Sequence, residues 1–256
     1  MDIYWFEQSM ADVPAKEAWL SASEASHVNA MHFPKRRADW LLGRWTAKNA
    51  VAVFLDITAE HHALRDIEIR PALSGAPEVF FKNELAALAI SFSHRAGVGA
   101  CALAPSGALL GCDLETIEPH GDAFATDYFT ADEQALVEEA GAADRLRLLA
   151  LLWSSKESAL KAMREGLRLD TRQVIVSFPG RPKMQSANPE NPAQRSCVSV
   201  QASPQRTGWR PLQVRRTNGQ IFRGWWSQTG DLLRTVLAAP PPGPPILLGQ
   251  ECSLSC

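Results

Sequence analysis

The chain has 256 residues, 46% of them hydrophobic and 21% charged, with a formal net charge of −2. This composition predicts a globular protein of one or two domains, and the nearly neutral charge argues against a dedicated nucleic-acid binder. No apolar run approaches the roughly 20 residues that cross a bilayer, and no basic and then apolar leader opens the chain, so we expect neither a membrane nor a secreted protein.

The first half of the chain, 1–108, combines helical and strand patterns. Apolar residues at helical spacing predict an amphipathic helix over 37–54. The sequence Ser74-Gly75-Ala76-Pro77 predicts a turn, and Arg95-Ala96-Gly97 predicts a hairpin turn. Strands are expected at 2–6, 67–70, 89–94 and 98–104.

The second half, 109–237, begins with a short buried strand at 109–114. Thr130 is a suitable N-cap for a helix that ends near 140, and an uninterrupted apolar stripe predicts the longest helix over 144–164. Strands are then expected at 174–178, 197–201, 220–225 and 233–237, with a loop rich in Pro and Asn at 179–192. Because each half pairs helices with a small antiparallel sheet, we expect an α+β fold of two similar lobes.

The last segment, 238–256, contains five prolines and a single formal charge at Glu251. This composition predicts an extended or disordered tail after the two lobes. The five cysteines of the chain form no CxxC pair, which suits a reducing compartment, so a cytoplasmic location is expected.

Two carboxylates alternate in the strand Gly111-Cys112-Asp113-Leu114-Glu115. Side chains two positions apart share one face of a strand, so Asp113 and Glu115 project together. Such a pair can hold Mg²⁺, which prefers oxygen ligands, although an isolated D-x-E is more often an acidic strand end that meets solvent.

A second pattern lies in the long predicted helix, in Trp153-Ser154-Ser155-Lys156-Glu157-Ser158-Ala159-Leu160-Lys161. Glu157 and Lys161 are four residues apart and therefore neighbours on one helical face. Taken alone they are an ordinary exposed ion pair. The same geometry would also let Glu157 bind a metal or accept a proton while Lys161 approaches a phosphate.

Donors for an anion gather at two further places. Ser93 and His94, at the end of a predicted strand, offer a hydroxyl and an imidazole, although a lone histidine at a turn is more often structural. Arg37 and Arg44 belong to a basic cluster on the predicted helix 37–54, where a charged run is normally a solvated face.

Together and in this order, these elements resemble the 4'-phosphopantetheinyl transferase family, in its two-lobed, monomeric, surfactin-type branch. The similarity extends from about 36 to about 237 and rests on Leu42-Gly43-Arg44, Phe92-Ser93-His94, the G-C-D-L-E strand and the W-S-S-K-E-S-A-L-K helix. The resemblance implies an enzyme of the holo-[acyl-carrier-protein] synthase type that transfers phosphopantetheine from coenzyme A to a serine of an apo acyl or peptidyl carrier protein, releasing 3',5'-ADP.

The resemblance also implies roles for individual residues. Asp113, Glu115 and Glu157 would hold Mg²⁺, and Glu157 would take the proton from the serine. Lys161 would stabilise the departing phosphate. At the nucleotide end, the resemblance assigns contacts with coenzyme A to Ser93, His94, Arg44 and Arg37.

One position departs from the family pattern. Many members have Gly-Lys-Pro where this chain has Gly75-Ala76-Pro77, so a phosphate contact is missing from its usual place. The segment 118–130, with Phe124, Tyr128 and Phe129, is either a docking surface for the carrier protein or a loop that its aromatic residues attach to the core.

Three other functions remain open from the sequence. A magnesium-dependent phosphohydrolase would use the same carboxylates with water as the acceptor. A catalytically silent module that binds coenzyme A or a carrier protein would explain the missing lysine. An interaction protein would use the charged residues only as surface ion pairs.

Overall fold

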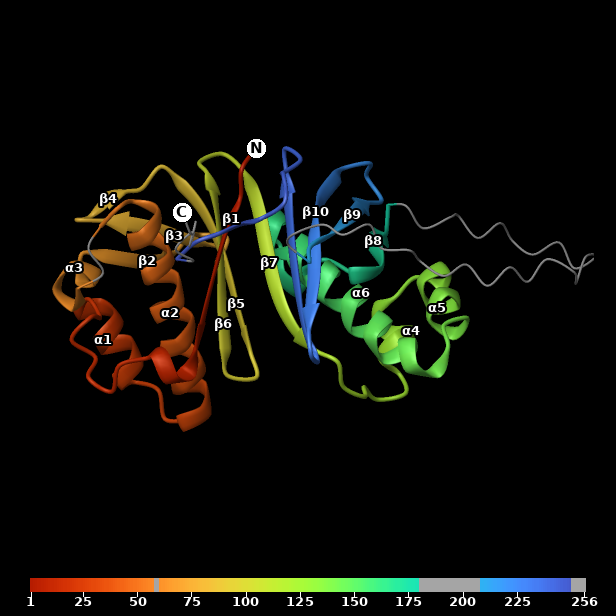
Figure 1. Cartoon of the computed structure of the whole chain (residues 1–256), viewed down its shortest axis with the longest axis horizontal. Coiled ribbons are helices and arrows are strands. Elements are labelled where there is room, and N and C mark those ends of the chain that lie inside the picture. Colours follow the sequence, from red (N-terminus) through yellow and green to blue (C-terminus); the bar gives the residue numbers. More distant parts are fainter. Residues whose placement is uncertain (58–59, 180–207, 250–256) are drawn as a thin grey trace, which may run out of the picture.

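The computed structural model describes residues 1–57, 60–179 and 208–249. Two sheets stand face to face in the centre of the molecule, and helices cover the outer face of each, as Figure 1 shows. The helices of the first lobe lie on one side of this pair, and the helices of the second lobe lie on the other. The expected α+β fold of two lobes, each with an antiparallel sheet and helices, is therefore confirmed.

The first lobe begins with a strand and places its longest helix against the sheet. Phe33 precedes the helix α2, whose first turn contains Pro34, a position where the missing N–H of proline costs no hydrogen bond. The elements are β1 (Tyr4–Ser9), η1 (Met10–Asp12), α1 (Ala22–Asn29), α2 (Pro34–Phe54), α3 (His61–Arg65), β2 (Ile67–Pro71), β3 (Pro77–Phe81), β4 (Glu84–Leu85), β5 (Leu88–Arg95) and β6 (Val98–Pro105).

The second lobe repeats this sequence of elements. The Thr130 side chain accepts a hydrogen bond from the Glu133 backbone and starts the helix α5, as its sequence predicts. The elements are β7 (Leu109–Thr116), α4 (Phe124–Tyr128), α5 (Ala131–Glu138), α6 (Ala142–Met163), η2 (Gly166–Arg168), η3 (Thr171–Gln173), β8 (Val174–Ser177), β9 (Arg210–Arg216), β10 (Ile221–Thr229) and β11 (Leu232–Ala239).

The two lobes share a strand order. In the second lobe the sheet runs β7-β11-β10-β9-β8, and in the first lobe β1 pairs with β6 and β6 with β5, while β3 pairs with β2 in a separate sheet with β4. In both lobes the first strand (β1 or β7) therefore pairs with the last long strand (β6 or β11). That strand pairs in turn with the one that precedes it in the sequence (β5 or β10).

The similarity extends to one buried ion pair in each lobe. Lys48 of α2 contacts Glu24 and donates hydrogen bonds to the carbonyl groups of Trp19 and Leu64. Lys156 of α6 contacts Glu133 and donates to two carbonyl groups of the segment after that helix. Both carboxylates belong to capping boxes and accept a backbone N–H from the strand behind them.

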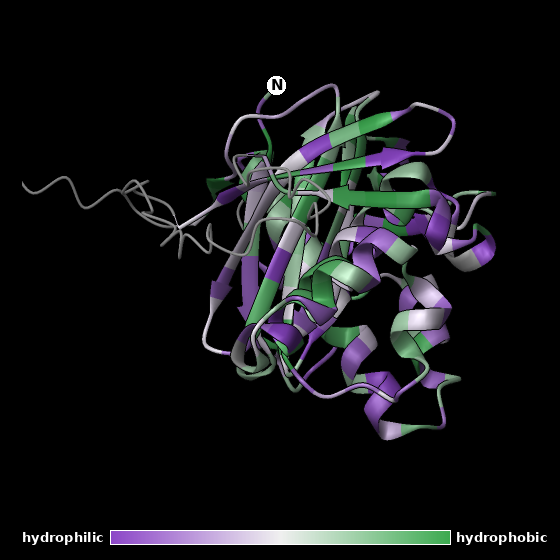
Figure 2. Cartoon of the chain, turned by 90° about the vertical axis from the view of Figure 1, so that its right-hand side faces the viewer, coloured by the Kyte–Doolittle hydropathy of each residue, from purple (hydrophilic) through white to green (hydrophobic). Residues whose placement is uncertain are grey.

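The two large sheets meet in a core of small and aromatic side chains. Ala100, Ala102 and Ala104 of β6 share this core with Trp5 of β1 and Cys112 of β7. Figure 2 shows hydrophobic colouring along the stacked strands, with hydrophilic residues prominent on the helices at the edge of the molecule. Because the alanines are small, the backbones of the two sheets approach closely, which brings β5 beside β7.

The prediction for the tail is wrong in part. The strand β11 continues to Ala239, and the chain then returns to the first lobe, where β12 (Ile246–Leu247) pairs in parallel with β1. The Ile246 N–H donates to the Ile3 carbonyl over 2.9 Å. Residues 240–249 are thus extended but ordered, while 250–256 lie outside the described residues.

Other strand predictions differ from the structure at their ends or were missing. The strands β3 and β9 were not expected, and β1 begins at Tyr4 and ends at Ser9 rather than covering 2–6. The predicted strand at 197–201 and most of the predicted loop at 179–192 lie outside the described residues. None of the described helices is both long and apolar enough to cross a membrane.

Candidate active site

Three residues predicted from separate motifs form one hydrogen-bonded group at the junction of the lobes. Lys161 Nζ of α6 lies 2.8 Å from Asp113 Oδ1 of β7 and donates to it. Ser93 Oγ of β5 donates to the same oxygen over 2.9 Å, and Lys161 lies 3.2 Å from this hydroxyl. The nearby Asp113 carboxylate raises the pKa of Lys161 although burial acts to lower it, so Lys161 is a cation.

Gly111 allows this approach of helix and strand. A Cβ at this position would overlap the backbone oxygen of Ser158 in α6, so only glycine fits. The Lys161 ammonium group consequently reaches the Cys112 carbonyl at 3.0 Å as well as the Asp113 carboxylate. The glycine of the G-C-D-L-E strand therefore has a packing role that the motif alone does not reveal.

Glu157 lies one turn before Lys161 and next to the two strand carboxylates. Its Oε1 atom is buried and has no hydrogen-bond partner among the described residues. Burial raises the pKa of Glu157, and the nearby Asp113 and Glu115 carboxylates raise it further. A carboxylate with a raised pKa and a free oxygen can accept a proton or bind a cation.

Glu115 lies on the same face of β7 as Asp113, as the alternation of the strand predicts. Its Oε1 atom accepts the Thr116 backbone N–H over 2.8 Å and lies 3.0 Å from Arg95 Nε. Burial raises the pKa of Glu115, while these two contacts oppose the rise. Arg95, from the predicted hairpin turn, also forms an ion pair with Glu118.

Arg44 and His94 lie together at the predicted nucleotide end. The Arg44 guanidinium is stacked over the Trp40 and Phe92 rings, at 5.0 and 5.4 Å, and its Nε atom has no hydrogen-bond partner in the described part of the chain. His94 is exposed as a residue, but desolvation of the ring lowers its pKa, so the imidazole is neutral at pH 7 in the free protein. A charged imidazole at this position therefore requires an anion beside it.

Arg37 has a different environment from Arg44. It forms an ion pair with Glu17, in the segment between η1 and α1. No hydrogen bond or ion pair links it to the other predicted site residues among those the structure describes. Its assignment to coenzyme A stays a prediction without a structural contact to support it.

Lys156 stands directly before Glu157 in the W-S-S-K-E-S-A-L-K helix but serves the fold. It is fully buried, and its Nζ lies 2.8 Å from Glu133 Oε2. Burial lowers the pKa of Lys156, and Glu133 opposes the change. The pair connects α6 to the start of α5, a role that the sequence alone did not reveal.

The aromatic residues of the segment 118–130 pack against the second lobe. Phe129 is fully buried, and Phe124 is stacked on His120 and contacts the rings of Trp153 and Tyr128. Tyr128 is exposed by about one third. The structure therefore favours the second interpretation of this segment, in which the aromatic residues attach the loop to the core.

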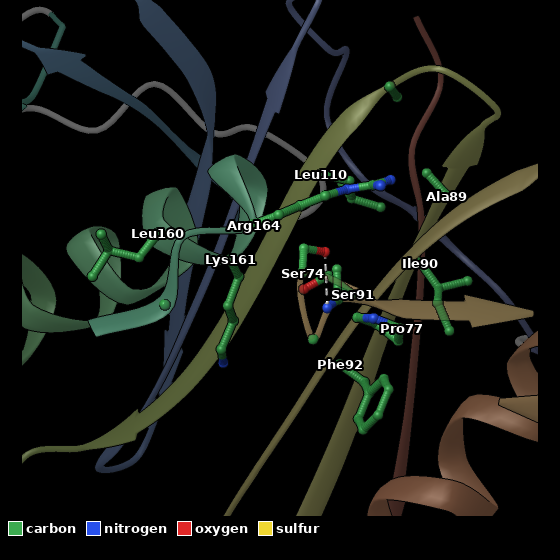
Figure 3. Close-up of a pocket in the computed structure, with 14 residues that line it drawn as sticks. Ser74, Pro77, Ala89, Ile90, Ser91, Phe92, Leu110, Leu160, Lys161 and Arg164 are labelled. Carbon is green, nitrogen blue, oxygen red and sulfur yellow. Dashed lines mark hydrogen bonds between the residues drawn. The ribbon is translucent and has the colours of Figure 1, made fainter. Parts of the chain in front are cut away.

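A cavity of about 270 Å³ opens beside the cluster, between the two lobes. Figure 3 shows the residues around it: Ser74 from the turn before β3, Pro77 at the start of β3, Phe92 from β5, Lys161 from α6 and Arg164 directly after α6. Ala76 also contributes to the lining. The side chain that replaces the expected lysine therefore faces a cavity next to Lys161.

The residues present fit a hard divalent cation by their chemistry. Asp113, Glu115 and Glu157 offer only oxygen ligands, and the buried Glu157 Oε1 atom lacks a partner. In the described residues no three His, Cys, Asp or Glu side chains are gathered closely enough to form a metal site. Lys161 and Arg95 instead neutralise two of the carboxylates.

Comparisons with known proteins point to one family. Residues 109–210 match the sequence model of the 4'-phosphopantetheinyl transferase superfamily. The chain is 24% identical over 173 residues to the 4'-phosphopantetheinyl transferase HetI of Nostoc sp., a match that covers 66% of this chain and 70% of HetI.

A solved structure of Helicobacter pylori holo-[acyl-carrier-protein] synthase in complex with coenzyme A is 19% identical. The match has a TM-score of 0.28 and covers 41% of this chain and 99% of that one. The matched segment 109–210 contains the G-C-D-L-E strand and the W-S-S-K-E-S-A-L-K helix, from which Asp113, Glu157 and Lys161 meet. Residues 109–210 are therefore similar to the 4'-phosphopantetheinyl transferase superfamily.

Proposed function

We propose that this protein transfers the 4'-phosphopantetheine group of coenzyme A to a serine hydroxyl of an apo acyl or peptidyl carrier protein. One observation carries the proposal: the junction of the lobes brings an acceptor for a proton, Glu157, together with the Lys161 cation. The proposed activity is of the holo-[acyl-carrier-protein] synthase type, in a monomer of the two-lobed surfactin-type branch. Both lobes contribute to the site, through Ser93 and Asp113, which agrees with a single chain acting alone.

The reaction forms a bond between the serine oxygen and the β-phosphorus and breaks the bond from that phosphorus to the bridging oxygen. Glu157 accepts the proton of the serine, a role that suits a carboxylate whose pKa is raised by burial. Lys161 stabilises the negative charge that gathers on the departing 3',5'-ADP. Asp113 and Ser93 hold the Lys161 ammonium group in position through their hydrogen bonds.

Asp113, Glu115 and Glu157 are the residues that would hold Mg²⁺ in this proposal. The ion supplies positive charge to the diphosphate when it is bound. Arg44 and His94 would contact the nucleotide, since the Arg44 guanidinium is a cation beside the Phe92 ring and the His94 imidazole gains a proton more easily beside a phosphate. A cytoplasmic location is part of this proposal because coenzyme A is the substrate.

Intact mass spectrometry of carrier proteins tests the proposal. The purified protein is incubated with coenzyme A, Mg²⁺ and a panel of apo acyl and peptidyl carrier proteins. We expect one carrier to gain a single phosphopantetheinyl group, and we expect EDTA or Glu157→Gln to reduce the rate by at least about 100-fold, as for loss of a general base.

Glu139→Gln is the matched control because Glu139 is an exposed carboxylate of the neighbouring segment after α5. It should retain the rate of the wild type. Release of 3',5'-ADP without any carrier protein would instead indicate the phosphohydrolase. Binding of coenzyme A without transfer to any carrier or to water would indicate the silent module, and a Glu157→Gln protein that transfers normally would remove Glu157 from the mechanism.

A further inference from the structure

We propose that Arg164 binds a phosphate group of coenzyme A in the cavity between the lobes. This inference rests on the proposed function and names a residue that the sequence motifs do not include. The cavity is lined by two cationic side chains, Lys161 and Arg164, and by no acidic one. Such a lining favours a ligand with negative charge.

The position of Arg164 supports this role. It lies three residues after Lys161, directly after the last residue of α6. Figure 3 shows its side chain extending toward Leu110, whereas that of Lys161 points another way. A ligand with several phosphate groups can therefore meet a cation on two sides of the cavity.

The guanidinium of Arg164 is available to a ligand. In the parts of the chain that the structure describes, its side chain forms neither a hydrogen bond nor an ion pair. This differs from Arg37 and Arg95, which are both paired with glutamates. A planar guanidinium binds phosphate oxygens through two parallel N–H groups.

The backbone at Arg164 gives a second and independent observation. Its φ is 59°, in the left-handed region where a helix usually ends with glycine. An arginine here is strained where glycine is not, so the fold alone does not favour this residue. Binding of a phosphate in the cavity would offset this strain and so account for an arginine at this position.

Arg168 forms a hydrogen bond with the turn of the first lobe that lines the cavity across from α6. Its Nη2 atom donates to the Ser74 carbonyl at 3.4 Å and to the Arg164 carbonyl at 3.3 Å. The turn of the first lobe is thereby linked to the end of α6 in the second lobe. Ala76, in that turn, contributes no charge, so Arg164 and Lys161 supply the positive charge of the cavity.

Calorimetric binding of coenzyme A and of dephospho-coenzyme A tests the inference with Arg164→Ala, Arg164→Gly and Arg164→Lys. We expect the alanine and glycine variants to bind coenzyme A about 10-fold or more weakly, the loss typical of a charged hydrogen bond. Arg164→Lys should recover part of the affinity. Arg145→Ala removes an exposed arginine of α6 and should leave binding unchanged.

Thermal unfolding separates binding from folding. Arg164→Gly should unfold at the same temperature as the wild type or higher, because glycine relieves the strain at φ 59°. If Arg164→Gly binds coenzyme A more weakly but is at least as stable as the wild type, the variant has lost a ligand contact and not its structure. An equal loss with both ligands assigns Arg164 to the diphosphate, and a loss with coenzyme A alone assigns it to the 3'-phosphate.

The outcomes also separate this inference from the proposed function. A wild-type protein that binds coenzyme A and modifies a carrier, with Arg164→Ala binding equally well, overturns the role of Arg164 only. A wild-type protein that neither binds coenzyme A nor modifies any carrier overturns both.

Discussion

Glu157 is a single residue whose place in the site reduces the stability of the folded protein. Its carboxylate is partly buried, has one oxygen without a partner among the described residues, and lies near Asp113 and Glu115. Desolvation and repulsion both disfavour its ionised form, which is the form that accepts a proton. The ionised Glu157 carboxylate that the proposed reaction needs therefore lowers the free energy of unfolding of the protein.

We expect Glu157→Gln to stabilise the protein at high pH. Because the pKa of Glu157 is above the ordinary value of 4.5 in the folded state, the stability of the wild type is complete below that value and falls as pH rises through the raised pKa. Without a divalent cation, the variant should melt about 2–4 °C higher at pH 8, the effect of roughly 1 kcal/mol.

Melting curves from pH 4 to pH 8 check this expectation. The difference in Tm between Glu157→Gln and the wild type should shrink toward zero at pH 4, where both side chains are neutral. The same series with Glu139→Gln serves as the control for an exposed carboxylate. A difference that is constant with pH, or that favours the wild type at pH 8, would contradict the raised pKa.

At the scale of the element, the buried Lys156–Glu133 pair sets the position of α6. Lys156 connects the helix to the chain that follows it, and Glu133 connects the start of α5 to β8. The corresponding pair in the first lobe, Lys48–Glu24, holds α2 in the same way. Each lobe thus uses one buried ion pair to join its helices to its sheet.

We expect Lys156→Met to destabilise the protein by about 3–5 kcal/mol, because it leaves Glu133 buried without its partner. Denaturation with urea measures the loss. Lys156→Met combined with Glu133→Gln should be more stable than the single variant, since no charge is then left unpaired. Lys48→Met should show a similar loss, and a cost below about 1 kcal/mol for both lysines would contradict the role of these pairs.

The sequence predicted elements well where the signal was local. The helix over 144–164 and the helix α6 (Ala142–Met163) nearly coincide, because apolar periodicity and a following glycine are both contained in the segment itself. The strand β9 was missed although Leu212 and Val214 are buried at alternate positions, since Pro211 and the arginines around them favour a loop. Local composition also predicted disorder where β12 pairs with β1, a contact between distant parts of the chain.

The sequence predicted those residues of the candidate site that belong to a motif. Ser93, Asp113 and Lys161 share hydrogen bonds and Glu157 lies near Asp113, because helix and strand periodicity fix the faces on which they lie. Arg164 was not predicted, because it lies just after the end of α6 and belongs to no motif. Its role depends on the other lobe, whose turn at 74–77 completes the cavity.

At the scale of the whole molecule, two segments connect the lobes. The chain crosses once between β6 and β7, and it returns from β11 to the edge of β1 through residues 240–249. The Met1 amino group donates to the Pro241 carbonyl, and the Gly243 N–H donates to the Met1 carbonyl. A movement that separates the lobes must therefore break this second connection.

Two proline substitutions test the contribution of the returning segment. Ile246→Pro removes the N–H that donates to Ile3, whereas Leu247→Pro is the matched control because the Leu247 N–H has no recorded partner within the described ranges. We expect Ile246→Pro to lower Tm by about 2–4 °C relative to Leu247→Pro, as for one backbone hydrogen bond. Equal Tm values would show that β12 adds nothing to stability.

The pairing of β12 with β1 also bears on self-association. The sheet order β12-β1-β6-β5 places β12 at the outer edge, where it covers Tyr4 and Trp5 of β1. An uncovered strand edge is a template for another chain, and Tyr4 and Trp5 would make this one apolar. The two residues of β12 therefore reduce the part of β1 that can pair with another chain. A protein that lost them would be more prone to form β-sheet between copies even while each copy kept its active site.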